Sequence, residues 1–253
     1  RSTMRNIPHE GRYNYLRGLD RSVGEGKVGY FAGCMTLLTP NTLSSMRRIF
    51  EAAREDVLWA DKDGGVCCGR PLKLSGEVDS AQKMIDYNKS LFEKHQISTL
   101  VTSCPICLKV FREEYKLEGV EVLHHSEYIL RLIKQGRLKV RYASDATFTY
   151  HDPCELGRGC GIYDEPRAVI EAVGELLEPA HTGKNALCCG SSVANTAIGD
   201  AQQLTIARSV AAELEATGAQ TIVTACPLCK KAIARGAAKG VVDLSEVVAQ
   251  NLK

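Results

Sequence analysis

The stretch "STLVTSCPICLKVF" begins at Ser98, and the stretch "QTIVTACPLCKKAI" begins at Gln220, about 120 residues further along the chain. Both contain a short apolar run rich in β-branched residues that ends in Cys-Pro-x-Cys. Such a run predicts a buried strand, and a proline directly after the first cysteine predicts the first position of a helix. Each stretch therefore predicts a strand-to-helix turn with cysteines on it.

The elements around these two stretches repeat in the same order. Each half starts with a strand that leads to a cysteine, continues to Cys-Cys-Gly, and reaches Cys-Pro-x-Cys before a last strand and a serine that starts the closing helix. All corresponding landmarks lie about 120 residues apart. The pattern predicts a tandem duplication, and strands that alternate with helices predict two Rossmann-like α/β halves with parallel sheets, related by a pseudo-twofold axis. The predicted domains are an arm or linker at 1–26, a first repeat at 27–143 and a second repeat at 144–253.

Several boundaries follow from local signals. Thr39 and Pro40 predict the start of a helix, and residues 57–60 predict a buried strand followed by a turn at "DKDGG". Helices are predicted over about 77–95 and about 199–217. Ser126 is expected to cap a helix that ends at Gly136.

Composition limits the classes of function. The chain has 253 residues, of which 44% are hydrophobic and 25% charged, with a net charge of +2. It can bury a substantial core, and it shows no charge excess that would suit nucleic acid or a membrane surface. Apolar runs are shorter than the roughly 20 residues that span a bilayer, and no signal-peptide core is visible. We expect a cytoplasmic protein that binds no nucleic acid and reaches a membrane face only through partners.

The eleven cysteines are the most informative residues. Their number is odd, and two neighbouring pairs cannot bridge easily because adjacent Cα atoms lie about 3.8 Å apart, below the usual disulfide span of about 4.4–6.8 Å. A disulfide framework is also typical of small secreted chains. The sequence therefore favours reduced thiols that hold a metal.

Ten of the eleven cysteines form two sets with nearly equal spacing. In the first, 32 residues separate the single cysteine from the pair and 35 separate the pair from Cys-Pro-x-Cys; in the second, these spacers are 33 and 36. Each cysteine group is expected directly after a strand, so the thiols should converge at the carboxyl edge of each sheet, where ligands bind in open α/β folds. The first thiol set is Cys34, Cys67, Cys68, Cys104 and Cys107. The second thiol set is Cys154, Cys188, Cys189, Cys226 and Cys229.

The local sequence favours thiolates at these positions. A cysteine at a helix N-terminus has a lowered pKa because the helix dipole stabilises the anion. Gly69 and Gly190 follow the paired cysteines, where the lack of a Cβ permits a tight turn. Three kinds of site remain open: zinc, which takes four ligands and would leave one cysteine of each set unused; a thioredoxin-like dithiol, which explains only Cys-Pro-x-Cys; and an iron–sulfur cluster, which suits all-cysteine ligation and is favoured.

The motifs resemble a known family. The doubled cysteine pattern, with "GYFAGC", "CCGRPL", "YHDPCELGR", "YDEPR" and "GAQTIVTACPLC", is similar to the cysteine-rich CCG domain of heterodisulfide reductase catalytic subunits. The same domain occurs in iron–sulfur subunits of anaerobic glycerol-3-phosphate, glycolate and lactate dehydrogenases. The resemblance covers about residues 27–253.

The resemblance implies an iron–sulfur oxidoreductase subunit that reduces a disulfide substrate between two non-cubane [4Fe-4S] clusters, one held by each thiol set. The alternative is an electron relay that passes electrons from a flavin dehydrogenase to quinone or another carrier. Zinc at one site is a further alternative for the cofactor. No ferredoxin-type Cys-x2-Cys-x2-Cys-x3-Cys run is present, so the implied partners are a ferredoxin-type iron–sulfur subunit or upstream domain and a flavoprotein subunit.

A few other residues are candidates for roles near the thiols. His151 and Asp152 precede Cys154 and are candidate proton donors or hydrogen-bond donors to a cluster. Glu155 departs from the family motif, which carries His at this position. Cys160 lies outside both sets and is expected to be a free thiol. Arg70 and Lys73 follow the first Cys-Cys-Gly and could bring positive charge to a cluster or an anionic substrate.

Overall fold

The computed structural model describes residues 27–60, 67–191 and 198–253. The predicted arm at 1–26 and the predicted turn at 61–65 lie outside the described residues. The first half runs β1 (Val28–Phe31), α2 (Gly33–Leu37), α3 (Pro40–Ala52), β2 (Val57–Trp59), α4 (Arg70–Leu74), α5 (Val78–Lys94), β3 (Thr99–Thr102), α6 (Pro105–Glu113), β4 (Glu121–His124) and α7 (His125–Lys134). The second half runs β5 (Thr147–His151), α8 (Gly157–Cys160), α9 (Asp164–Glu171), β6 (Glu175–Leu176), η2 (Gly183–Asn185), α10 (Asp200–Glu215), β7 (Thr221–Thr224), α11 (Pro227–Ala234), β8 (Val241–Asp243) and α12 (Leu244–Gln250).

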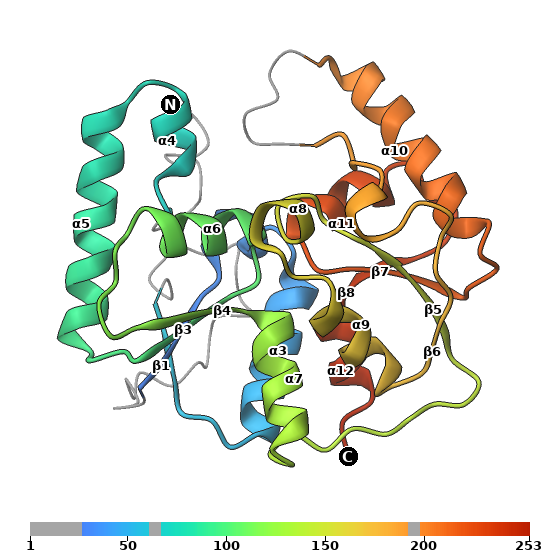
Figure 1. Cartoon of the computed structure of the whole chain (residues 1–253), viewed down its shortest axis with the longest axis horizontal. Coiled ribbons are helices and arrows are strands. Elements are labelled where there is room, and N and C mark those ends of the chain that lie inside the picture. The colour runs from blue at the N-terminus through green and yellow to red at the C-terminus, as the bar shows by residue number, and fades with distance from the viewer. Residues whose placement is uncertain (1–26, 61–66, 192–197) are drawn as a thin grey trace.

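The strands form two four-stranded sheets, one in each half (Figure 1). The strand order is β2-β1-β3-β4 in the first sheet and β6-β5-β7-β8 in the second, and every pairing is parallel. Apolar residues fill the central strands because both faces of such a sheet are covered by helices. The predicted α/β class, with two pseudo-symmetric Rossmann-like halves, is confirmed.

The strand order creates a switch point in each sheet. From β1 the chain leads to β2, on one side of β1, and from β3 it leads to β4, on the opposite side of the sheet. The connections that leave the neighbouring strands β1 and β3 therefore run in opposite directions. The connections that leave β5 and β7 do the same in the second sheet. A crevice opens beyond the carboxyl ends of such strands, and it is the usual ligand position in open α/β sheets. Cys34 and Cys104 follow β1 and β3, and Cys154 and Cys226 follow β5 and β7.

Local signals placed most elements correctly. The helix from Pro40, the strand within 57–60 and the helices within 77–95 and 199–217 are all present. Two expectations were wrong. Ser126 does not cap α7: His124 does, because its imidazole accepts a hydrogen bond from the Ser126 backbone N–H. Cys67 and Cys188 also do not directly follow a strand, since β2 ends at Trp59 and β6 ends at Leu176.

The two halves pack through helices that follow the first and last strands of each sheet. Helix α12 lies against α3, α9 and α7, and α7 lies against α9; Figure 1 shows these four helices together at the lower centre. One continuous apolar cluster extends across the junction, from the aromatic core of the first half to buried α12 residues such as Val248. The contact between the halves is therefore part of the core.

Buried polar groups also meet at this junction. The His125 Nε2 and Asp243 Oδ1 atoms lie 3.3 Å apart, and both side chains are fully buried. Asp243 is the N-cap of α12, as His124 is the N-cap of α7, and each helix has a capping box with a glutamate.

Within the described residues, no helix is both long and apolar enough to cross a membrane.

Candidate functional site

The five thiols of the first set lie together. They form one chain of hydrogen bonds in the order Cys34, Cys67, Cys68, Cys107 and Cys104. Cys34 is half-buried, and the other four are buried. The pKa of Cys68 is lowered to about 5 because Cys107 and Cys67 hydrogen-bond to its thiolate, with the larger effect from Cys107. A thiolate favoured in this way would suit a metal.

The second set has the same connectivity. Its chain of hydrogen bonds runs through Cys154, Cys188, Cys189, Cys229 and Cys226. The Sγ atoms of Cys189 and Cys229 lie 3.2 Å apart. Hydrogen bonds, first from Cys154 and then from Cys189, lower the pKa of Cys188. Residues more than seventy positions apart in each half thus reach one place, as the repeat predicted.

The local backbone explains this convergence. Cys104 and Cys226 are the N-caps of α6 and α11, with proline at the first helical position. The second cysteine of each motif lies one turn further on, which brings both thiols to the same side of the helix. The pKa of Cys226 is lowered chiefly by a hydrogen bond from Cys229, and the backbone N–H groups at the start of α11 add to the effect.

Glycine is required after each cysteine pair. Gly69 has a φ of +92° and Gly190 a φ of +75°, which is the left-handed region that favours glycine. A Cβ on Gly190 would lie 2.7 Å from a side-chain carbon of Ile206. Gly33, directly before Cys34, also has a positive φ, and a Cβ there would lie 3.1 Å from the Cys107 Sγ. The thiols are thus brought close by backbone that no other residue type adopts easily.

A small pocket opens beside the second set. It has a volume of about 50 Å³. Its lining residues are Ile106, Pro153, Cys154, Glu155, Cys188, Ser191, Cys226, Leu228 and Cys229. Ile106 belongs to the first half and lies between two cysteines of the first set, so the two thiol sets are neighbours across the junction.

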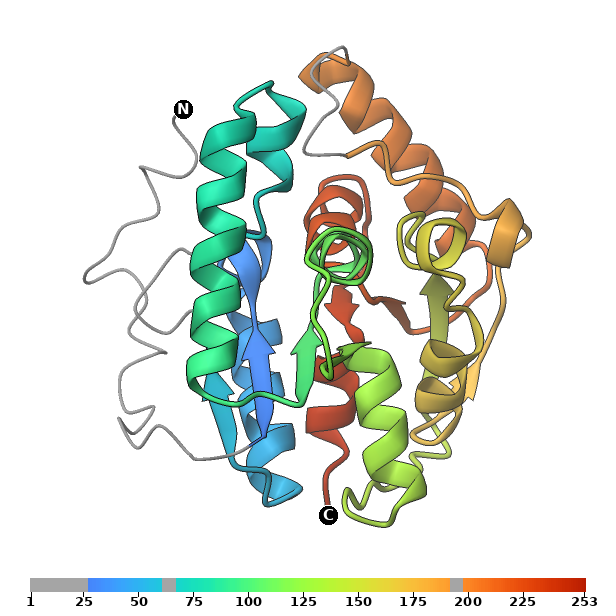
Figure 2. The same cartoon turned by 60° about the vertical axis from the view of Figure 1, so that its left-hand side comes forward.

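Helix packing explains why the two sets are adjacent. Helix α2, which carries Cys34, contacts α11, and α8, which follows Cys154, contacts α6. Figure 1 shows α6, α8 and α11 next to one another near the centre of the molecule, and in Figure 2 α6 is seen end-on at the centre. Each site is therefore bordered by a helix of the other half, as a pseudo-twofold arrangement requires.

The donor atoms suit an iron–sulfur cluster. Each set offers five thiols that hydrogen-bond one another in a chain, and it includes no imidazole or carboxylate. Ligation by cysteine alone is typical of iron–sulfur clusters. Within the residues that the structure describes, no three His, Cys, Asp or Glu side chains are spaced to hold a single metal ion. The thiols instead contact one another in a chain.

His151 and Asp152 have partners other than the pocket. The His151 ring contacts the Thr224 Oγ1 at 3.3 Å and the Leu187 carbonyl at 3.1 Å, and burial lowers its pKa. Asp152 forms a two-pronged ion pair with Arg167, with both distances 2.8 Å. Neither residue lines the pocket, and their predicted catalytic role stays a prediction. The acidic side chain that does line it is Glu155.

The remaining candidates contribute less. Cys160 is half-buried at the end of α8 and has no part in either hydrogen-bonded chain of thiols. The Lys73 Nζ forms an ion pair with Glu114 at 2.8 Å, so part of its charge is neutralised. Arg70 begins α4 directly after Gly69. Residues that the sequence reasoning missed are Ile106 at the pocket and Arg158, which lies four positions after Cys154 and ends the "YHDPCELGR" motif.

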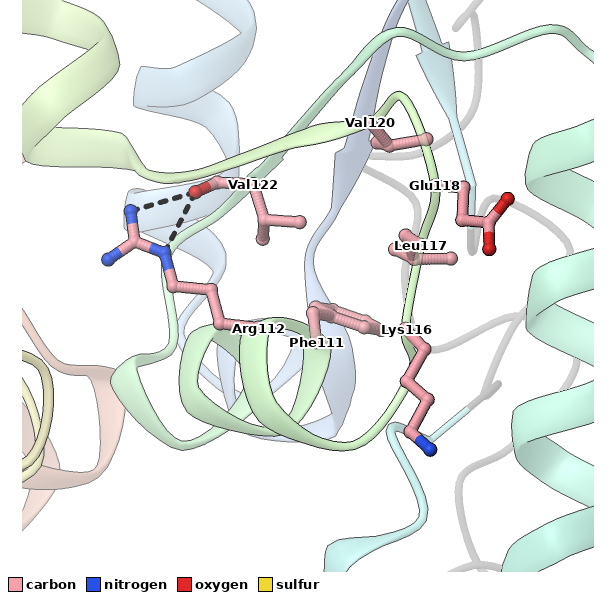
Figure 3. A pocket seen from close by; sticks show the side chains of 7 residues that line it. All are labelled: Phe111, Arg112, Lys116, Leu117, Glu118, Val120 and Val122. Atoms are coloured by element: carbon pink, nitrogen blue, oxygen red, sulfur yellow. Dashed lines mark hydrogen bonds between the residues drawn. The ribbon is translucent and has the colours of Figure 1, made fainter.

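Larger cavities lie at the exposed edge of β4. One of about 340 Å³ is lined by the end of α6 and the segment that leads into β4 (Figure 3). Arg112 crosses its rim and donates from Nε and Nη2 to the Val122 carbonyl, at 3.0 and 2.8 Å. The guanidinium also pairs with Glu127. No cysteine lines this cavity.

Comparison with known proteins identifies the family. The model of the cysteine-rich domain family called CCG matches residues 28–112 and again residues 148–234. The chain belongs to this family and carries two copies of its domain.

Curated relatives are similar to much of the chain. A fumarate reductase (CoM/CoB) subunit of Methanothermobacter marburgensis is 28% identical over 235 residues, which are 90% of this chain and 45% of the relative. A dihydromethanophenazine:CoB–CoM heterodisulfide reductase subunit of Methanosarcina acetivorans is 26% identical over 88% of this chain and 58% of the relative. EtfAB:quinone oxidoreductase of Syntrophomonas wolfei is 29% identical over 67% of this chain and 25% of the relative. The chain thus spans about half, or less, of the length of these relatives.

A solved structure also aligns loosely. Glutamate racemase from Aquifex pyrophilus is 17% identical, with a TM-score of 0.38, over 88% of this chain and 81% of that protein. This similarity is too low to carry an inference.

Proposed function

We propose that this member of the CCG family is an oxidoreductase subunit that binds two [4Fe-4S] clusters of the non-cubane kind and reduces a disulfide substrate. The observation that carries the proposal is the identical connectivity of five thiols in each half, at the switch point of each sheet. Both sets are complete, so each half offers a full set of ligands. The heterodisulfide reductase subunit among the relatives supports the same function.

The chemistry requires two electrons and two protons. A disulfide RSSR′ accepts two electrons and two protons and yields RSH and R′SH, while the S–S bond breaks. The clusters would supply the electrons one at a time. The first and second thiol sets would hold the clusters, and the pocket beside Cys154 and Cys188 would admit the substrate sulfur.

The surroundings of the pocket would serve binding and protonation. Ile106 and Leu228 provide apolar contacts for the carbon chain of a substrate. Glu155 places a carboxyl group beside Cys154 and Cys188, where a thiolate product needs a proton. These side chains support an aliphatic disulfide as the proposed substrate class.

A second candidate function is electron relay. EtfAB:quinone oxidoreductase is among the relatives, and it supports a role in which the same sites pass electrons between a flavoprotein and quinone. In both cases we propose a flavoprotein and a ferredoxin-type protein or domain as partners. We also propose a cytoplasmic location, with attachment to a membrane face only through partners.

One assay separates the two functions. The chain is purified without oxygen, and reduced benzyl viologen is mixed with it and with an unsymmetrical aliphatic disulfide. Disulfide reduction predicts viologen oxidation that depends on the disulfide and releases two thiols per disulfide. Cys160→Ser should retain this activity, and Cys188→Ser should lose it.

A relay predicts a different result. Viologen would reduce the protein, a quinone analogue would oxidise it again, and the disulfide would have no effect. That result, with both clusters present, would contradict the proposed disulfide reduction.

A further inference from the structure

The segment that precedes Cys188 is held by side chains from the segment around Cys154. The Arg158 Nη1 donates to the Lys184 carbonyl at 3.0 Å and to the Ala186 carbonyl at 2.9 Å. The His151 Nε2 lies 3.1 Å from the Leu187 carbonyl, and because a carbonyl only accepts, this ring nitrogen is the donor. The last two carbonyls before Cys188 are therefore both bound.

Asp152 adds an anchor at the start of the same segment. Its Oδ2 accepts a hydrogen bond from the Gly183 backbone N–H at 2.8 Å. Arg167 fixes the carboxylate from the other side with two hydrogen bonds of 2.8 Å, and its guanidinium lies over the Tyr150 ring, 5.3 Å from the centroid. Asp152 is 3% exposed, so the anchor is shielded from water. Charge-assisted bonds of this kind are roughly twice as strong as neutral ones.

The anchors and Cys154 lie on one short piece of chain. His151 and Asp152 are three and two residues before Cys154, and Arg158 is four residues after it. The same piece therefore places the Cys154 thiol and holds the backbone that leads to Cys188. The two thiols hydrogen-bond each other.

The first half lacks the corresponding side chains. Counted from Cys34 as from Cys154, the positions of His151, Asp152 and Arg158 are occupied by Phe31, Ala32 and Leu38. None of these side chains can donate or accept a hydrogen bond. Phe31 instead packs edge-to-face on Phe111, with ring centroids 4.9 Å apart. The two sites are thus built from the same thiols but different supports.

We propose that Arg158, together with His151 and Asp152, is a positioning residue that preassembles the Cys154–Cys188 side of the second site before a cofactor binds. The equivalent positions of the first half, Phe31, Ala32 and Leu38, carry no side chain that could do this. The part of this inference that concerns a cluster rests on the proposed function. The part that concerns the two thiols does not, because it describes the metal-free protein.

The first test uses the full chain without metal. Dibromobimane, which bridges two thiols only when they are close, is added, and peptide mass spectrometry measures the yield of the Cys154–Cys188 bridge. Replacing Arg158 by the residue of the first half, in Arg158→Leu, should lower this yield several-fold. The Cys34–Cys67 bridge in the same sample should be unchanged, which excludes general unfolding.

Matched variants separate positioning from other effects. Arg131→Leu removes an arginine of the first half that pairs with Glu121 at the surface, and it should leave the bridging yield unchanged. Arg158→Lys should restore most of the yield, because one ammonium group can also donate to two carbonyls. His151→Phe, again the residue of the first half, should lower the yield like Arg158→Leu.

The second test uses the cluster-loaded protein. Redox titration followed by electron paramagnetic resonance should show that Arg158→Leu changes the signal of one cluster and lowers its midpoint potential, because a cation near the site has been removed. The other cluster should keep its signal and potential.

Two outcomes would overturn the proposal. One is an equal Cys154–Cys188 bridging yield in the unmodified protein, Arg158→Leu and His151→Phe. The other is an Arg158→Leu variant in which both clusters keep the spectrum and the midpoint potential that they have in the unmodified protein. A protein that binds no iron would contradict the proposed function, while the bridging yields would still decide whether Arg158 positions the thiols.

Discussion

Single glycines determine whether the paired cysteines can face the other thiols. Gly69 and Gly190 turn the chain with a positive φ directly after each pair. The sequence predicted this need from the Cys-Cys-Gly motif, but it could not show that Gly190 also lies against Ile206 of α10. That contact depends on how the long helix packs, which no local pattern encodes.

Gly190→Ala should destabilise the protein more than an alanine at another left-handed glycine. The new Cβ would lie 2.7 and 2.9 Å from carbons of Ile206, and we expect a loss of roughly 1–3 kcal/mol from overpacking in addition to the backbone cost. Gly183→Ala is the control, because Gly183 also has a positive φ but no atom within 4 Å of its Cβ position. Urea unfolding measures both. Equal losses would show that the contact with Ile206 is unimportant.

Single cysteines should report which thiols hold which cofactor. Cys188→Ser removes a thiol in contact with Cys154 and Cys189, so we expect loss of about half of the bound iron while the first site keeps its share. Cys160→Ser should lose none, because this thiol lies outside both sets. Iron analysis of protein prepared without oxygen gives the result. Loss of iron in Cys160→Ser would contradict the assignment of ligands.

At the scale of elements, the sequence predicted those whose signals are local. Apolar runs, prolines at helix starts and glycines after pairs located α3, α5, α6, α10 and α11. The two-residue strand β6 was missed because it is too short for a periodic pattern and is defined by pairing with β5. The cap of α7 was misplaced because histidine is not among the preferred N-cap residues, and its role depends on the His124 imidazole reaching the Ser126 backbone N–H.

Burial of this cap predicts a pH dependence of stability. His124 is fully buried, and burial first, then the neighbouring His125, holds its pKa well below the ordinary value of 6.5. Below about pH 6.5 the unfolded chain binds a proton at this position and the folded chain does not. The free energy of unfolding should therefore fall as the pH is lowered, by up to about 1.4 kcal/mol per pH unit from this group.

His124→Asn tests this prediction. Asparagine retains a capping oxygen but does not titrate. Urea midpoints measured between pH 8 and pH 5 should fall less steeply for the variant than for the unmodified protein. Parallel curves would contradict the assigned role of His124.

At the scale of the whole molecule, one apolar cluster extends through both halves, and a second cluster lies within the second half. Helix α12 of the second half packs against α3 and α7 of the first, and the buried His125–Asp243 contact crosses the same junction. The duplication could be predicted from the sequence because the corresponding cysteines and serines of the two halves all lie about 120 residues apart. The junction between the halves could not be predicted, because no local sequence pattern shows which helices pack against one another.

This shared core predicts that the chain unfolds in one step. The single tryptophan, Trp59, lies in the first half and reports on that half by fluorescence, whereas far-ultraviolet circular dichroism reports on helices of both. The two urea transitions should coincide, as expected for a cooperative unit. Two separate transitions would show that the halves are independent.

Under the proposed function, the two thiol sets hold two four-iron clusters. The most direct test is to purify the chain without oxygen and to measure iron, acid-labile sulfide and zinc per polypeptide. Two four-iron clusters predict about eight iron and about eight sulfide per polypeptide, with no zinc. Zinc without iron and sulfide would contradict the proposed function.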